Sequence, residues 1–208
     1  MMSSTLLILL GGYLIGSIPS GYLAGKIFKK IDIRKYGSGN IGTTNVFRTL
    51  GWKFGLAVFL ADFCKAFAFV QIVKWFYFQQ QPLLLVLAAF LLIVGNVFPV
   101  FLRFKGGKGV ASSAGIFVGL CPFALLLALV VFFLAVYFTR YVSLGSLLAT
   151  VTLFVVNLYF YLQGQDSLLV VLILTGAIMV FIWWKHAANI KRILNGTERK
   201  LGKKKEKL

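Results

Sequence analysis

The sequence alternates between long hydrophobic runs and short polar stretches rich in Gly, Ser, Asn, Lys and Arg. An apolar run of about 20 residues is long enough for an α-helix to cross a membrane. The pattern therefore predicts an all-α fold, a polytopic integral membrane helix bundle of about seven transmembrane helices, some of them short or broken. The predicted segments are residues 4–25, 54–78, 83–102, 110–120, 122–139, 144–163 and 168–186.

The fourth and fifth segments allow two interpretations. Residues 110–139 could form one long tilted helix, whereas Cys121-Pro122 offers a break. With a break, the fourth segment rises only about 16 Å, which is less than the ~30 Å of hydrocarbon in a bilayer. A short helix that follows a polar loop is typical of membrane proteins that build an internal polar cavity.

The composition agrees with a single membrane domain. The chain has 208 residues, 60% of them hydrophobic, and a mean hydropathy of +0.90. Because no long polar segment could form a second domain, we expect one membrane-embedded domain over residues 1–208, with a basic cytoplasmic tail over about 196–208. Residues 1–5 lack the basic residues of a signal peptide, which indicates a retained first helix. Cys64 and Cys121 lie in apolar runs and are expected to be buried packing residues.

The basic residues predict which side of the membrane each loop faces. The net charge is +17, and all of the 22 Lys and Arg residues except Lys65 and Lys74 fall into four stretches that share a face in a seven-helix topology. By the positive-inside rule that face is cytoplasmic and the N-terminus is outside. A six-helix topology with both termini on one side is the alternative. Basic residues beside membrane segments indicate membrane lipid, not nucleic acid, as a partner. The four stretches are residues 26–53, residues 103–109, the turn at Arg140 and the tail after Trp184.

Two glycine-rich loops on this predicted face are candidates for binding an anion. The first, Gly37-Ser-Gly-Asn-Ile-Gly42, matches a dinucleotide-binding pattern, but it neither follows a strand nor opens a strand–helix unit. Its glycines would still let backbone N–H groups approach a phosphate closely. Arg48 follows within one or two helical turns and could clamp two phosphate oxygens. A plain flexible loop is the alternative.

The second loop, Phe104-Lys-Gly-Gly-Lys-Gly-Val110, contains two lysines among three glycines. It lacks the spacing of a nucleotide-binding P-loop, because Leu102 stands where the first glycine belongs and Gly109 follows Lys108. Amide donors at a helix N-terminus, together with two ammonium groups, favour an anion site. A positive-inside stop signal is the alternative.

Polar residues also interrupt the first two hydrophobic segments. Gly16-Ser-Ile-Pro-Ser-Gly21 lies within the first segment and predicts either a kink or the wall of a polar pocket. Asp62 and Lys65 share one face of the second segment. Charges within hydrocarbon are costly and are usually functional, although these two could simply pair with each other.

His186 is the only histidine, and its spacing places it on roughly one helical face with Asn189 and Arg192. An incidental interfacial histidine is the alternative. No Ser-His-Asp set, catalytic cysteine or acidic metal cluster can be assembled, so we expect neither a cofactor nor a metal. Cations, amides, hydroxyls and one imidazole suit transfer of an activated group to a hydroxyl of a phosphorylated acceptor. A transporter or flippase for organic anions or lipid phosphates is the alternative, but the predicted outer side is nearly featureless.

The chain resembles the bacterial acyl-phosphate:glycerol-3-phosphate acyltransferases over essentially its whole length. The resemblance implies a seven-helix enzyme of the bacterial inner membrane, which we expect to be a monomer with its active site in the cytoplasm. Such an enzyme transfers a fatty acyl group from acyl phosphate to glycerol 3-phosphate and yields lysophosphatidic acid, the first step of phospholipid synthesis. The motifs that carry the resemblance are Gly16–Gly21, Tyr36–Asn45, Gly95–Val110, and His186–Arg192 followed by Gly196-Thr-Glu198.

Three positions depart from the family pattern. Ile41 stands where the family usually has Pro, and Thr43 stands where Ala is common; both changes should affect loop stiffness more than charge. Asn96 occupies the place of a histidine found in many members, so His186 is the one imidazole left for proton transfer. Either His186 or a phosphate oxygen of the substrate would then be the base, and we favour the phosphate.

The residue patterns and the resemblance together define the expected site. The expected catalytic residues are His186, Asn189, Lys108, Arg48 and Ser38. The expected substrate- and phosphate-binding residues are Gly37, Gly39, Asn40, Gly42, Thr44, Asn45, Lys105, Gly106, Gly107, Gly109, Ser143 and Arg192.

Overall fold

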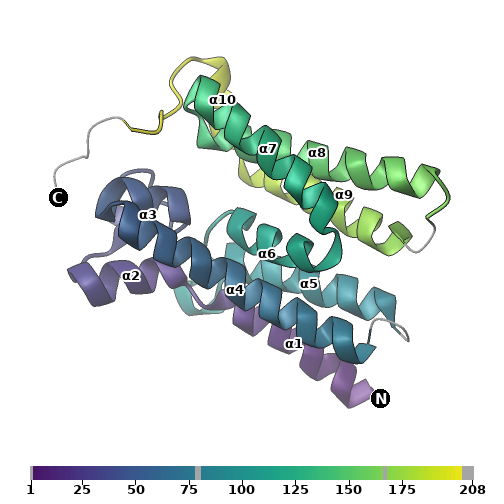
Figure 1. Ribbon diagram of the computed structural model, residues 1–208. Helices are drawn as coiled ribbons and strands as arrows, with labels where there is room; N and C mark the ends of the chain where they lie inside the picture. The colour runs from purple at the N-terminus through teal and green to yellow at the C-terminus, as the bar shows by residue number, and fades with distance from the viewer. Residues whose placement is uncertain (1, 78–80, 166–167, 203–208) are drawn as a thin grey trace. The chain divides into compact units, whose positions relative to one another are not determined.

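The computed structural model describes residues 2–77, 81–165 and 168–202, and every regular element in these ranges is helical. The predicted all-α class is confirmed, and Figure 1 shows the course of the helices. The predicted basic tail lies partly outside the described residues. The α-helices are α1 (Met2–Ser17), α2 (Ser20–Lys29), α3 (Thr43–Leu50), α4 (Trp52–Tyr77), α5 (Pro82–Val97), α6 (Val110–Leu120), α7 (Pro122–Thr139), α8 (Val142–Leu162), α9 (Leu169–Lys185) and α10 (Ala187–Leu194).

The helices belong to two compact units, one up to Gly119 and one from Leu120 onward. In the first unit α1 packs along α5, and α4 contacts both of these helices as well as α2 and α3. In the second unit α8 packs between α7 and α9, and α10 contacts both α8 and α9. The expectation of a single domain stays a prediction.

The helices confirm a multi-pass membrane protein. Five stretches are long and apolar enough to cross a membrane, and a sixth is obtained if α9 and α10, bent by 61°, form one span. All seven predicted segments are helical, but α6 has only 11 residues, so the count of seven is approximate. The five stretches are Ser3–Lys29, Trp52–Tyr77, Pro82–Leu102, Pro122–Thr139 and Val142–Leu162.

Prolines interrupt both the stretch 110–139 and the predicted segment 4–25. Residues 110–139 form two helices, because α6 ends at Leu120 and Pro122 is the first residue of α7. Proline suits the first position of a helix, where its missing N–H costs no hydrogen bond. In the first segment, α1 ends at Ser17 and α2 begins at Ser20, directly after Pro19. The interpretation with a break at Cys121-Pro122 is therefore confirmed.

Small residues let α1 and α5 approach each other closely. A Cβ atom at Gly16 would overlap the backbone of Leu92, and one at Gly95 would overlap the carbonyl of Tyr13. The Tyr13 hydroxyl donates to the carbonyl of Phe98 at 2.9 Å. Glycine at such positions is typical of helix pairs in membranes, which gain contact area when their backbones come close.

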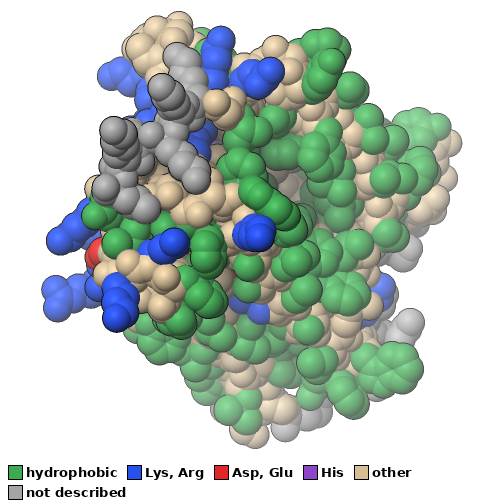
Figure 2. Space-filling view, turned by 60° about the vertical axis from the view of Figure 1, so that its left-hand side comes forward, with side chains coloured by type: hydrophobic (Ala, Val, Ile, Leu, Met, Phe, Trp, Pro, Cys, Tyr) green, Lys and Arg blue, Asp and Glu red, His purple; other side chains and the backbone are tan. Residues whose placement is uncertain are grey.

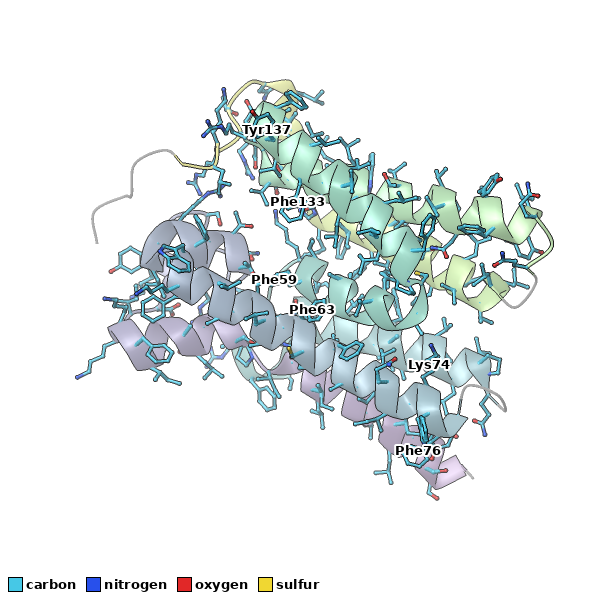
Figure 3. The ribbon with its side chains drawn as sticks, viewed as in Figure 1. Phe59, Phe63, Lys74, Phe76, Phe133 and Tyr137 are labelled. Carbon is cyan, nitrogen blue, oxygen red and sulfur yellow. The ribbon has the colours of Figure 1, made fainter. Side chains whose placement is uncertain are left out.

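Much of the surface is hydrophobic. Figure 2 shows hydrophobic side chains over much of the visible face. Phe76 on α4 and Phe133 and Tyr137 on α7 are exposed (Figure 3). Cys64 on α4 is exposed too, so the expectation that it is buried is wrong, whereas Cys121 is buried. Exposed apolar area of this extent is unusual for a protein in water, whereas it suits helices that contact lipid chains.

Candidate functional site

Asn45 holds the first loop, residues 36–42, in its observed shape. Its amide is buried on α3, and its Oδ1 accepts from the backbone N–H of Ser38 at 2.7 Å. Its Nδ2 lies 3.3 Å, 3.1 Å and 2.7 Å from the carbonyl oxygens of Ile33, Tyr36 and Asn40. The structure shows the amide of Asn45 engaged inside the loop, and the expectation that Asn45 binds substrate stays a prediction.

Glycine is required in the first loop by backbone conformation and by space. Gly37 and Gly39 have φ of +58° and +73°, which few residues other than glycine adopt without strain. A Cβ atom at Gly37 would also overlap Oδ1 of Asn45. The N–H of Gly39 donates to Tyr36, and the N–H of Gly42 donates to Oδ1 of Asn40. Because these amides are engaged within the loop, the exposed hydroxyl of Ser38 is better placed to meet an anion than they are.

The second loop, residues 103–109, folds back onto the end of α5. The N–H groups of Gly106 and Gly107 donate to the carbonyls of Val97 and Asn96 at 3.1 Å and 3.0 Å. A Cβ atom at Gly106 would overlap the carbonyl of Asn96, so this return requires glycine. Gly109, with φ of +81°, leads directly into α6. Here too the engaged glycine amides leave the lysines as the groups that could meet an anion.

The two loops are joined directly. Nδ2 of Asn40 donates to the carbonyl of Gly106 at 3.4 Å. Lys105 is exposed on the second loop and Lys108 is half-buried. Within the first unit, therefore, the structure brings Ser38 and the two lysines onto connected loops. The adjoining helix α3 carries Thr44 in its first turn and Arg48 in its last.

The second unit gathers three further expected site residues around Glu198. Its Oε1 accepts from the hydroxyl of Ser143 at 2.8 Å and from Nδ2 of Asn189 at 2.7 Å. Its Oε2 accepts from Nε of Arg192 at 2.8 Å. In the sequence, Glu198 stands out only as the last residue of the Gly196-Thr-Glu198 motif. A further signal was available, because acidic residues are rare in this chain, which has only five.

Glu198 stays ionised although its side chain is only 3% exposed. Burial alone would raise the pKa of this carboxyl group. Hydrogen bonds from Asn189, Arg192 and Ser143, together with the charge of Arg192, outweigh burial and hold the pKa of Glu198 below its usual value. The carboxylate therefore fixes the orientation of three residues on α8 and α10.

His186 lies at the bend between α9 and α10 and is only 2% exposed. Its Nδ1 is 2.8 Å from the carbonyl oxygen of Ile182. A carbonyl can only accept, so Nδ1 carries a proton in this contact. In a neutral ring with its proton on Nδ1, Nε2 would be the nitrogen that takes up a proton.

The charged pair on α4 serves the neighbouring helices. Lys65 and Asp62 are 2.7 Å apart, and Lys65 also donates to the carbonyls of Gly16 and Ile18. Lys74 (Figure 3) donates to the carbonyl of Gly119 at the end of α6 at 2.8 Å. The two basic residues outside the four predicted stretches thus bind backbone carbonyls near helix ends. Within the described ranges, no three His, Cys, Asp or Glu side chains could together hold a metal ion.

These features define an integral membrane protein whose connected loops present hydroxyl and ammonium groups. The chain belongs to the glycerol-3-phosphate acyltransferase family, because the family model of that description matches residues 6–196. The glycerol-3-phosphate acyltransferase of Chlorobium limicola is 42% identical to this chain over 231 aligned residues, and the alignment covers 96% of this chain and 97% of that protein. The enzyme of the same name from Bacillus subtilis is 43% identical over 200 residues, and the alignment covers 96% of this chain and 98% of that protein.

Solved structures agree with this assignment. The chain is similar to PlsY (YgiH), an integral membrane glycerol 3-phosphate acyltransferase, in its glycerol 3-phosphate form, with a TM-score of 0.86 and 37% identity. Its lysophosphatidic acid form gives a TM-score of 0.84 and 36% identity. In both cases the similarity covers 96% of each chain. The alternative of an anion transporter loses its support.

Proposed function

We propose that this protein transfers a fatty acyl group from acyl phosphate to glycerol 3-phosphate, giving lysophosphatidic acid and phosphate. Family membership supports the acceptor and the product, and the donor is the further step that we infer. The reaction would take place at the cytoplasmic face of a bacterial inner membrane, with the protein acting as a monomer. The structural observation that supports the proposal most is the contact between Asn40 and Gly106, which joins the two loops that carry Ser38, Lys105 and Lys108.

The residues have distinct roles in this proposal. Lys105, Lys108 and Arg48 would neutralise the charge of the bound phosphates, with Ser38 donating a hydrogen bond. Asn40 and Asn45 would keep the loops in shape, as their hydrogen bonds to Gly106 and Ser38 suggest.

The second unit would complete the reaction. Ser143, Asn189 and Arg192 are already oriented by Glu198 and would act together with His186. The family match spans residues 6–196 and so includes Ser143, Asn189 and Arg192 as well as the loops of the first unit. We infer that both groups of residues serve one reaction.

The chemistry needs little beyond positioning. A glycerol hydroxyl attacks the acyl carbonyl carbon, the carbon–oxygen bond to phosphate breaks, and phosphate leaves with the bonding electrons. An acyl phosphate is a mixed anhydride with a good leaving group, so binding and charge stabilisation supply most of the rate. The hydroxyl proton passes to a phosphate oxygen of the substrate or to Nε2 of His186. We favour the phosphate oxygen, with His186 holding the substrate in place.

The donor is tested by comparing acyl carriers. Purified protein in lipid vesicles is given glycerol 3-phosphate with palmitoyl phosphate, palmitoyl-CoA or palmitoyl-acyl carrier protein, and lysophosphatidic acid and phosphate are measured. Of the three donors, we expect only palmitoyl phosphate to give lysophosphatidic acid, with one phosphate released for each molecule of product. Product from a thioester but not from the phosphate would overturn the proposed donor, while acyl transfer itself would stand.

His186 is tested by replacement with alanine. We expect His186→Ala to insert and fold but to lose most of its turnover. A general base contributes ~10²–10⁴-fold to rate, so a loss in this range together with a changed pH profile would identify the histidine as the base. A smaller loss with an unchanged profile fits a positioning role. Turnover equal to that of the wild type would remove His186 from the site. The control is Asn195→Ala, at an exposed position after α10, which should keep the turnover of the wild type.

A further inference from the structure

The first hydrophobic segment is broken at Ile18 and Pro19, between α1 and α2. Because α1 stops at Ser17, the carbonyls beside the break have no N–H from a further turn of α1 as a partner. Nζ of Lys65 on α4 donates to two of them, the carbonyl of Gly16 at 3.2 Å and that of Ile18 at 2.8 Å. The break is therefore satisfied in part by a side chain 47 positions or more further along the chain. The backbone N–H of Ser20 also donates to the carbonyl of Ile18, at 3.1 Å.

Asp62 binds the other side of the same break. Its Oδ1 accepts from the hydroxyl of Ser20, the first residue of α2, at 2.8 Å, and lies 2.7 Å from Nζ of Lys65. The end of a helix carries partial negative charge and the start of a helix carries partial positive charge. The ammonium group thus lies at the end of α1 and the carboxylate at the start of α2. Both side chains are almost buried, at 11% and 9% exposure.

The start of α2 contacts the first loop. A Cβ atom at Gly21, the residue after Ser20, would overlap the carbonyl of Ile41 and would lie 3.1 Å from Cγ2 of Val46. Ile41 stands between Asn40 and Gly42, whose hydrogen bond helps to shape this loop. A shift of α2 would therefore press directly on the backbone of the loop.

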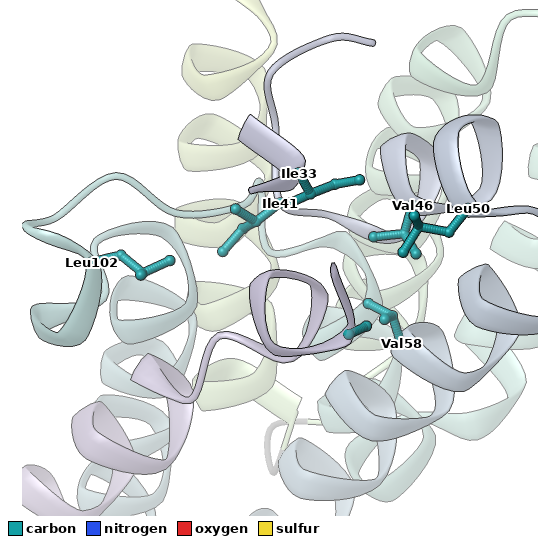
Figure 4. Packing of buried hydrophobic residues seen from close by; sticks show 7 residues of the cluster. Ile33, Ile41, Val46, Leu50, Val58 and Leu102 are labelled. Carbon is teal, nitrogen blue, oxygen red and sulfur yellow. The ribbon is translucent and has the colours of Figure 1, made fainter. Parts of the chain in front are cut away.

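A buried hydrophobic cluster completes the connection. Ile41 and Val46 belong to one buried cluster with Val58 (Figure 4). Val58 lies on α4 one helical turn before Asp62. Helix α4 thus reaches the loop through Val58 and reaches the start of α2 through Asp62. The two contacts together hold α2 and the loop in one arrangement.

We propose that Ser20, Asp62 and Lys65 are positioning residues that set the first loop for binding glycerol 3-phosphate. The proposal rests on the proposed function. None of the three residues would touch the reacting atoms. Loosening their contacts changes how well the loop holds the phosphate, so the KM for glycerol 3-phosphate rises more than kcat falls.

The test compares two serines of the same break. Ser20→Ala removes the hydrogen bond to Asp62 and leaves the Asp62–Lys65 ion pair in place. We expect the KM for glycerol 3-phosphate to rise about fivefold or more, since a hydrogen bond to a charged group is among the stronger ones. We expect kcat and the melting temperature to stay close to those of the wild type. Ser17→Ala is the matched control, because the buried hydroxyl of Ser17 has no hydrogen-bond partner among the described residues, and its KM should not change.

A conservative variant and a binding measurement make the result decisive. Ser20→Thr keeps a hydroxyl group and should restore the low KM. Calorimetric titration with glycerol 3-phosphate, without acyl donor, should show weaker binding to Ser20→Ala than to the wild type, Ser20→Thr or Ser17→Ala. An unchanged KM in Ser20→Ala, or a loss of kcat and melting temperature at constant KM, overturns the positioning role. A wild-type protein that neither binds glycerol 3-phosphate nor transfers acyl groups overturns the proposed function instead.

Discussion

Glu198 is the hydrogen-bond acceptor for three side chains that the sequence predicts as site residues. Its hydrogen bonds to Ser143, Asn189 and Arg192 connect the start of α8, the helix α10 and the segment that follows α10. Burial of a carboxylate is unfavourable unless donors replace the lost water. Here three donors do so, one of them charged, and the carboxylate holds their side chains in fixed directions. A phosphate approaching these residues would meet side chains that are already oriented.

The lowered pKa of Glu198 predicts a pH-dependent stability. The folded state holds this carboxyl group ionised, whereas the unfolded chain takes up a proton near the usual value of 4.5. The unfolded state then binds more protons, so the stabilisation is present above that pH and is lost as the pH falls through the lower folded-state pKa. We expect the apparent melting temperature in detergent to fall as the pH is lowered below about 4.5.

The variant Glu198→Gln separates this carboxylate from other acidic groups. Its melting temperature at neutral pH should be lower than that of the wild type, because charge-assisted hydrogen bonds contribute about 1.5–3 kcal/mol each to the free energy of unfolding. Its melting temperature should also depend less on pH below about 4.5. Glu206→Gln, in the tail, is the control and should behave like the wild type. Equal pH dependence in Glu198→Gln and the wild type would contradict the role assigned to Glu198.

The sequence supplies the residues of the candidate site as predictions, but it does not supply their hydrogen-bond partners. Glycine clusters with lysines indicated anion-binding loops because few other functions need both. The pattern could not show that the amide of Asn45 is engaged with Ser38, because that contact depends on how the loop closes. Likewise Glu198 gave no periodic signal, since it follows the last helix and reaches Ser143 across 55 positions.

At the scale of helices, the hydrophobic pattern located every segment but not the contacts between them. The prolines at positions 19 and 122 were visible as breaks, and the structure has both. The sequence left open whether Asp62 and Lys65 are functional or simply pair with each other. The structure shows that they pair and that they also bind Ser20 and the carbonyls beside the polar break, which the sequence did not indicate. Hydrogen bonds between residues so far apart follow from helix packing, which periodicity does not specify.

Two glycines of α1 test how closely this helix packs. A Cβ atom at Gly16 would overlap the backbone of Leu92, which cannot move aside as a side chain could. One at Gly11 would meet only a ring carbon of Phe69 at 3.9 Å, an ordinary contact. We expect Gly16→Ala to destabilise the protein by about 1–3 kcal/mol or more. Gly11→Ala should be neutral or slightly stabilising, because alanine favours a helix over glycine.

Thermal unfolding in detergent checks this pair. A change of 1 kcal/mol moves the melting temperature by about 2–4 °C in a chain of this size. Gly16→Ala should therefore melt several degrees below the wild type, and Gly11→Ala should not. Equal melting temperatures for the two variants would mean that α1 and α5 can move apart without cost, against the close approach seen at Gly16.

For the whole molecule, the distribution of charge predicts the topology. All basic residues except Lys65 and Lys74 lie in four stretches, and those two exceptions bind backbone carbonyls near helix ends. They are therefore accounted for by structure and do not weaken the charge asymmetry. The positive-inside rule then places the N-terminus outside and the C-terminus inside, provided that α6 and α7 together cross the membrane twice.

Labelling of single cysteines decides between seven and six crossings. In a background with Cys64→Ala and Cys121→Ala, Gln165→Cys lies between α8 and α9, and Asn195→Cys follows α10. With seven crossings, a membrane-impermeant maleimide added to intact bacterial cells should label Gln165→Cys and spare Asn195→Cys. Lysed cells should show both labelled, which controls for reactivity. With six crossings the pattern reverses, because residues 110–139 then cross only once, and every later segment changes sides. The reversed pattern would also move Ser143 and His186 away from the side of the glycine loops and would contradict the single reaction proposed for them.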